Sequence, residues 1–166
     1  MAANRANIGW YLDNQIGGED DRITGRVYER EVALSNSELK DLSATPKELV
    51  PAPGVGRFIE FVSAVLFLDY GSNILVESGA NDNLIIEYDD GSGAAVCTTI
   101  ESTGFIDQAV DQIMLALATV LAGSTTASSV VNKNLALLTD QDAFTGNASN
   151  DTVMKVKVTY RIHDFN

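Results

Sequence analysis

The sequence predicts an all-β fold, a β-sandwich or jelly-roll-like domain that carries an extended N-terminal arm. About eight short apolar or alternating segments are separated by turn signals, a pattern typical of sandwiches and jelly rolls. The C-terminal segment alternates apolar and polar residues, as a half-buried strand does. The 166 residues fit a single domain. We therefore divide the chain into an arm of residues 1–26 and a β-sandwich domain of residues 27–166.

The arm follows neither helical nor strand periodicity, yet it contains the only tryptophan of the chain. A tail without a partner usually lacks aromatic residues, whereas a segment that docks on a surface uses them as anchors. The surface could be its own domain, a sister subunit or another protein. We predict partner contacts through Arg5, Ile8, Trp10, Tyr11, Ile16, Arg22 and Arg26.

The first elements of the domain are predicted from the residue pattern and from the positions of the prolines. Residues 27–34 predict a strand, and residues 37–42 predict one helical turn with Ser35 or Asn36 as its cap. All three prolines of the chain follow, at positions 46, 51 and 53, and they predict loops and a turn at Pro53-Gly54.

The most apolar strand is predicted at residues 57–69, and it is apolar on both faces. A strand with one solvated face should alternate apolar and polar residues. We therefore expect both faces to be covered, which indicates an oligomer. One face carries Phe58, Val62, Leu66 and Leu68. The other is the predicted oligomer contact and carries Ile59, Phe61, Val65 and Phe67.

Three further segments predict strands, and a fourth is ambiguous. Residues 83–88 and 94–100 flank an acidic, glycine-rich loop and predict a hairpin, and residues 134–139 predict another strand. Residues 108–121 have apolar residues at helical spacing, although Ile113, Leu115 and Leu117 also alternate with smaller neighbours. Periodicity alone favours a helix there.

The last strand has a basic outer face formed by Lys155, Lys157 and Arg161. This stripe is a second candidate contact with a partner protein. The favoured alternative is pairing with acidic residues of adjacent strands, such as Glu87.

Composition excludes several function classes. The net charge of −12 opposes binding to nucleic acid or to anionic membranes, because such binding needs a basic face. No apolar run reaches the roughly 18 residues of a membrane span, and no secretory signal is recognisable. The single cysteine, Cys97, excludes an internal disulfide and is predicted to be a small buried hydrophobe.

The catalytic inventory is small, so we predict that the protein is not an enzyme and has no catalytic residues, cofactor or metal. His163 is the only histidine and is expected on the surface at the end of the last strand. A zinc site needs more histidines or cysteines. The acidic pairs lie in turns, where solvated carboxylates are ordinary. Calcium held by residues 81–83 or 140–142 is a less favoured alternative.

A series of short motifs resembles one known family. It comprises residues 39–54 (LKDLSATPKELVPAPG) before a long apolar strand, NLIIEYDDGSG at 83–93, TGFIDQ at 103–108, NKNLAL at 132–137, Gly146-Asn147 and VKVTYRIH at 156–163. In this order, they resemble the head decoration, or cement, proteins that tailed bacteriophages encode beside the major capsid protein. The resemblance covers residues 37–163, and residues 1–36 depart from it.

The resemblance implies a β-sandwich on the outer surface of the virion, where it clamps neighbouring capsomers and has the phage major capsid protein as its partner. It implies synthesis in the host cytoplasm, a strand rather than a helix at residues 112–119, and a homo-oligomer, with a trimer favoured over a dimer. Two other functions remain as alternatives. One is a β-sandwich binding module for calcium or carbohydrate, like an adhesin or lectin, and the other is a tail-tube or connector subunit.

Overall fold

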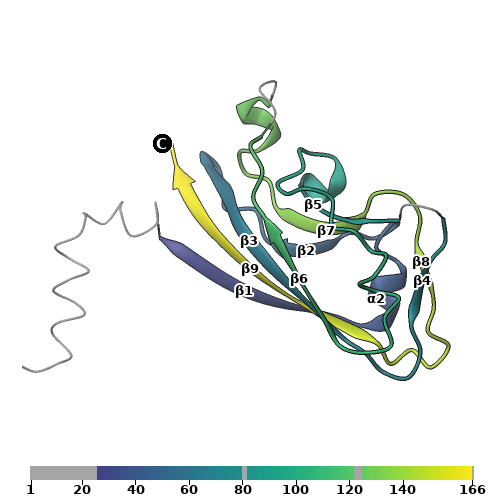
Figure 1. The fold of residues 1–166 in the computed structure, drawn as a ribbon. Coiled ribbons are helices and arrows are strands. Elements are labelled where there is room, and N and C mark those ends of the chain that lie inside the picture. Colours follow the sequence, from purple (N-terminus) through teal and green to yellow (C-terminus); the bar gives the residue numbers. More distant parts are fainter. Residues whose placement is uncertain (1–25, 80–81, 122–124, 166) are drawn as a thin grey trace, which may run out of the picture.

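The computed structural model describes residues 26–79, 82–121 and 125–165. Figure 1 shows the long strands side by side, with a short helix and a small two-stranded sheet at one end. The elements are β1 (Val27–Leu34), α2 (Asn36–Lys40), β2 (Lys47–Val50), β3 (Arg57–Asp69), β4 (Leu75–Glu77), β5 (Leu84–Tyr88), β6 (Gln112–Leu117), β7 (Leu135–Thr139), β8 (Phe144–Gly146) and β9 (Val153–Asp164).

The strands form three antiparallel sheets within the described ranges. The largest has the order β1-β9-β3-β6, the second has the order β2-β7-β5, and β4 pairs with β8. This arrangement confirms the predicted all-β, sandwich-like fold.

The core lies between the two larger sheets and is almost entirely aliphatic and aromatic. Leu66 of β3 pairs with Val156 of β9, and both are fully buried, as are Leu84 of β5 and Leu137 of β7. Removing such side chains from water is the main force that favours folding. The alternation of β9 in the sequence therefore reports one buried face, as predicted.

The helical turn is confirmed, displaced by one or two residues from its predicted bounds. Ser35 is the N-cap, and its hydroxyl accepts from the Glu38 N–H while the Glu38 carboxylate accepts from the Ser35 N–H at 2.8 Å. This reciprocal capping box satisfies two backbone donors that the first turn of a helix otherwise leaves unpaired.

A β-bulge in β3 corrects the predicted faces of that strand. The pairing of β3 with β9 shifts by one residue between Phe61 and Ser63. Because one extra residue moves the following side chains to the opposite face, Ile59 and Phe61 lie in the core, but Val65 and Phe67 point away from it. The four predicted oligomer-contact residues therefore do not share a face, and two are buried within their own domain.

Residues 112–117 form strand β6, so the helix favoured by periodicity is wrong and the strand implied by the family resemblance is confirmed. Pairing with β3, from Leu68 opposite Gln112 to Ser63 opposite Leu117, overrides the local spacing. Residues 94–100 make only isolated bridges beside β5 and β6 rather than the regular strand that was predicted. The sequence patterns did not reveal the short strands β2, β4 and β8.

Candidate functional site

The face of the four-stranded sheet that points away from the core is the candidate interaction surface. We call it the outer face. Register places on it alternate residues of all four strands. One half is charged and belongs mainly to β1 and β9, and the other half is apolar and belongs to β3 and β6.

The charged half is organised around Glu60. His163 Nε2 lies 2.7 Å from Glu60 Oε2, and Arg161 NH1 lies 3.4 Å from Glu60 Oε1. The hydrogen bond from His163, followed by the charge of Arg161, lowers the pKa of the Glu60 carboxyl below its ordinary value. His163 also stacks on Phe58 with ring centroids 5.0 Å apart, so it is half-buried rather than freely exposed as predicted.

The predicted basic stripe is divided by its ion pairs. Lys157 Nζ lies 3.5 Å from Glu29 Oε2 of β1, whereas Arg161 contacts Glu60 of β3. Pairing therefore occurs with the adjacent strands of the same sheet and not with Glu87, which lies on β5 of the second sheet. Lys155 is exposed at the other end of the stripe. Exposed pairs of this kind contribute about 0–1 kcal/mol each to stability.

The apolar half is the surface that the sequence interpretation missed. Ile113, Leu115 and Leu117 of β6 are 70%, 57% and 59% exposed, and they lie beside Val65 and Phe67 of β3. We call these five residues the apolar edge. The alternation of the three β6 residues was visible in the sequence, but the helical spacing of the same segment outweighed it. Contiguous exposed apolar surface of this kind typically marks a protein contact.

A second apolar feature lies at the end of the outer face near Phe58. A cavity of about 340 Å³ is lined by Phe58, Leu121, Val130, Val131, Phe165 and three small polar or methyl-bearing residues of the 125–127 segment. Phe165 stacks on Phe58 with ring centroids 5.6 Å apart and is 71% exposed. This cavity extends the apolar character of the surface beyond β6.

Most of the predicted arm contacts lie outside the described residues: Arg5, Ile8, Trp10, Tyr11, Ile16 and Arg22. Arg26 is the first residue that the structure describes, and it is exposed immediately before β1. The arm therefore joins the domain at the β1 edge of the four-stranded sheet, while β6 forms the opposite edge.

Two carboxylates of the acidic loops, those of Asp82 and Asp140, accept hydrogen bonds from backbone N–H groups. Asp82 is buried, and its two oxygens accept from the backbone N–H groups of Gly79 and Asp142, at 2.7 and 3.1 Å. Asp140 accepts from the N–H of Asn83 at 2.9 Å. Across the described ranges, no three His, Cys, Asp or Glu side chains are grouped as metal ligands would be. No helix in the same ranges is long and apolar enough to cross a membrane.

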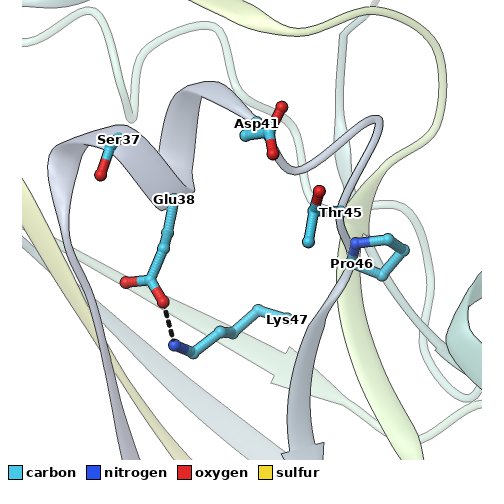
Figure 2. Close-up of a pocket in the computed structure, with 6 residues that line it drawn as sticks. All are labelled: Ser37, Glu38, Asp41, Thr45, Pro46 and Lys47. Carbon is cyan, nitrogen blue, oxygen red and sulfur yellow. Dashed lines mark hydrogen bonds and ion pairs between the residues drawn. The ribbon is translucent and has the colours of Figure 1, made fainter.

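Figure 2 shows a small polar pocket between α2 and β2, where the Glu38 carboxylate forms an ion pair with the Lys47 ammonium. The hydrogen bond from Lys47, followed by those from the Ser35 backbone and hydroxyl, lowers the pKa of Glu38 to about 2. Every oxygen of this carboxylate is thus engaged in holding the helix cap and the start of β2. The pocket is therefore a structural connection between α2 and β2.

Low pH should weaken this connection between α2 and β2. Because the pKa of Glu38 is about 2 in the folded protein against an ordinary 4.5, its stabilising effect is complete above pH 4.5 and is lost as the pH falls towards 2. Glu38→Gln should therefore reduce the loss of unfolding free energy between pH 5 and pH 2, by less than about 1 kcal/mol because the pair is partly exposed. Urea unfolding at both pH values measures the difference. Glu48→Gln, which removes only a 4.0 Å contact with Arg30, is the control. Equal pH dependence in the Glu38→Gln and wild-type proteins would contradict this account.

Comparison with known proteins gives no family assignment. No family model matches the chain, and no curated protein matches its sequence. Among solved structures, a chain of the capsid of Ralstonia phage GP4 has a TM-score of 0.47 and 16% identity, over 83% of this chain and 85% of that chain. A chain of the native-like genome-containing particle of DWV in acidic pH has a TM-score of 0.28 and 10% identity, over 86% and 77%. Both neighbours are chains of viral particles, and both TM-scores are too low to assign a function.

Proposed function

We propose that this protein is a structural component of a virion that binds the outer surface of a phage capsid and stabilises it by clamping adjacent capsomers. The observation that carries the proposal is the apolar edge, which is exposed among the described residues of a chain with a net charge of −12. A surface of this kind suits a protein that works in contact with other proteins. The motif order of residues 37–163 supplies the class of partner, the major capsid protein.

The strand conformation of β6 also supports the proposal, because it agrees with the family resemblance. The helical spacing of these residues outweighs their alternation, so local periodicity favours a helix, whereas the resemblance to decoration proteins implies a strand. A resemblance that anticipates a non-local feature of the fold carries more weight than one that repeats what the pattern already indicates.

The arm is the proposed contact with the capsid. Trp10 and Tyr11, with the nearby isoleucines, would bury aromatic and aliphatic surface on capsid protein, and Arg5, Arg22 and Arg26 would pair with its acidic residues. A protein that binds only the assembled shell stabilises that shell by mass action. Contacts with several capsomers at once would add avidity.

The charge of the chain suits a position on the outside of the shell. With 23 acidic against 11 basic residues, the protein is repelled by nucleic acid and would not compete with capsid protein for the packaged genome.

Binding to shells tests the proposal. We expect the full-length protein to co-sediment with mature shells of its phage that lack it, and to raise the temperature at which those shells break open. Deleting residues 2–25 should leave the melting temperature of the domain nearly unchanged and remove it from the pellet, because the described core lies entirely after this segment. Trp10→Ala should weaken binding, and Asn14→Ala in the same arm is the matched control.

The outcomes separate the parts of the proposal. Failure of the full-length protein to bind the shells would contradict the capsid function, and full occupancy by the deletion variant would contradict the role of the arm. Lys157→Glu tests the second predicted contact. Because Lys157 makes only an exposed 3.5 Å pair with Glu29, its reversal should leave stability nearly unchanged. Loss of shell binding in this variant would show that the basic stripe is a contact.

A further inference from the structure

The apolar edge is open on its face, whereas the side of β6 that lies away from β3 is partly occupied. At the end of β6, Ala118 bridges Cys97, and the Thr119 N–H donates to the Val96 carbonyl oxygen at 2.9 Å. This neighbouring segment lies where a further strand would have to pair. The side chains of the apolar edge point away from the core and are exposed among the described residues. An occupant of this surface must therefore pack on the face of the sheet.

The outer face changes character in a fixed order from β1 to β6. The arm attaches at the β1 side, where Val27 is exposed. The next strand is β9, which carries Lys155 and Lys157, and the last two are β3 and β6 with the apolar edge. In register, Lys155 lies opposite Phe67 and Phe67 lies opposite Ile113. Across the face from the arm attachment, basic surface therefore comes before apolar surface.

The arm has a matching order when it is read backwards from its attachment. Residues 19–21 (EDD) are acidic, and residues 17–18 are two glycines. Residues 8–16 (IGWYLDNQI) contain five aromatic or aliphatic side chains. The acidic part of the arm therefore comes before its apolar part, as the basic part of the outer face comes before the apolar edge.

We propose that the arm folds back over the outer face of its own domain, with residues 19–21 on the basic stripe of β9 and residues 8–16 on the apolar edge. Gly25 lies directly before the domain, and glycine adopts the backbone conformations that a sharp chain reversal requires. The inference concerns the protein free of any shell. Binding of the arm to capsid protein would remove it from the outer face, so the apolar edge would be uncovered at the same time.

The arm is long enough for this path. With strands about 4.8 Å apart and a rise of about 3.3 Å per residue, Lys157 lies about 14 Å and Ile113 about 25 Å from Val27. Asp21 comes six residues before Val27, and an extended chain of that length spans up to about 20 Å. Ile16 comes eleven residues before Val27 and can reach about 36 Å. Both reaches exceed the distances and leave slack for the chain reversal.

The charges of the basic stripe suit an acidic segment. Lys155 is exposed and forms no ion pair with any other residue in the described ranges. Lys157 contacts Glu29 at 3.5 Å, and both side chains are more than half exposed. Carboxylates of residues 19–21 would place opposite charge beside these two ammonium groups.

The size of the surface favours the arm over a second copy of the chain. The five side chains of the apolar edge are only partly exposed and present well under the roughly 800 Å² per partner of a stable complex. Two chains that each carry a net charge of −12 also repel one another. An attached segment has an effective concentration on the order of millimolar, so a contact too weak to join two chains is mostly formed within one.

The fluorescence of Trp10 tests the proposal in the full-length protein, because the chain contains no other tryptophan. We expect acrylamide to quench Trp10 at least about threefold less in the protein than in a synthetic peptide of residues 1–25. Leu115→Lys, which places an ammonium group in the apolar edge, should restore quenching to the level of the peptide. Val76→Lys changes an exposed valine of β4 in another sheet and is the matched control, which should behave as the wild type does.

The charged part of the contact is tested separately. Lys155→Glu should raise the quenching of Trp10 towards the level of the peptide, because it sets a carboxylate against residues 19–21. Lys155→Arg keeps the charge and should behave as the wild type does. Salt at about 1 M should reduce the difference between the two variants, since it screens exposed charges.

A nitroxide label tests the location without changing the apolar edge. The native Cys97 is buried, and burial raises the pKa of its thiol, so the label is directed to an introduced cysteine. Ser63→Cys lies on the outer face between Thr159 of β9 and Leu117 of β6. A label there should quench Trp10 severalfold more than the same label on Val76→Cys.

Three results would overturn the proposal. The first is quenching of Trp10 in the protein equal to that in the peptide. The second is protection of Trp10 that neither Leu115→Lys nor the Ser63→Cys label affects, which would place the arm elsewhere. The third is protection that rises with protein concentration together with a dimer in sedimentation, which would assign the surface to a second copy. If Leu115→Lys fails to fold, as judged by circular dichroism, the label decides. These measurements use no shells, so their outcome is separate from that of the capsid-binding test.

Discussion

Replacing Phe61 by alanine should lower the free energy of unfolding by about 3–5 kcal/mol, whereas the same replacement at Phe67 should cost much less. Both residues lie on β3, six positions apart. Phe61 is 4% exposed in the core, but Phe67 is half-buried on the outer face. A cavity left in a packed core costs both the transfer of the side chain and the contacts of its neighbours, and a surface side chain forfeits far less.

The pair of variants tests the β-bulge directly. Without the shift between Phe61 and Ser63, the two phenylalanines would share a face and their replacements would have similar costs. Urea denaturation followed by tyrosine fluorescence or circular dichroism gives both free energies, provided that the m-values stay equal. Comparable losses in the two variants would contradict the face switch.

Replacing Tyr88 by phenylalanine should cost about 1–3 kcal/mol, the second largest effect that we expect for a single side chain. Tyr88 ends β5 in one sheet, and its hydroxyl donates to the Ile59 carbonyl oxygen of β3 in the other. The residue is 1% exposed. Phenylalanine preserves the ring but leaves the carbonyl without this donor inside the core, where water does not replace it.

The pKa of the Tyr88 hydroxyl also predicts how the stability of the protein changes at alkaline pH. Burial, followed by the nearby charge of Glu60, raises the pKa of Tyr88 to about 12 from an ordinary 10. The raised pKa means that the protonated form is favoured by folding, so its stabilising effect is complete below pH 10 and is lost as the pH rises towards 12. Tyr88→Phe should therefore lose less stability over this window than the wild type, as measured by urea unfolding at pH 9 and pH 11. An unchanged alkaline response would contradict the effect assigned to burial of the Tyr88 hydroxyl. Tyr28→Phe, on β1 of the four-stranded sheet, is the control.

The sequence by itself determined the features that depend on local chemistry. The alternation of β9 and the apolar and polar pattern of β1 follow from the period of a strand with one buried face. A helix cap at Ser35 or Asn36 follows from side chains that can satisfy backbone donors of the first turn, and the structure selects Ser35. The net charge, and the poor affinity for nucleic acid that it predicts, needs no structure at all.

Only the tertiary structure decided the features that depend on which strands meet. A single extra residue in β3, invisible to periodicity, moves Val65 and Phe67 to the outer face. Residues 112–117 suit a helix in isolation, and hydrogen bonding to β3 makes them a strand. The apolar edge results from both features. The bulge turns Val65 and Phe67 outward, and β6 places its own exposed apolar side chains beside them. Pairing between segments about fifty residues apart is a non-local choice, and no window of sequence contains both partners.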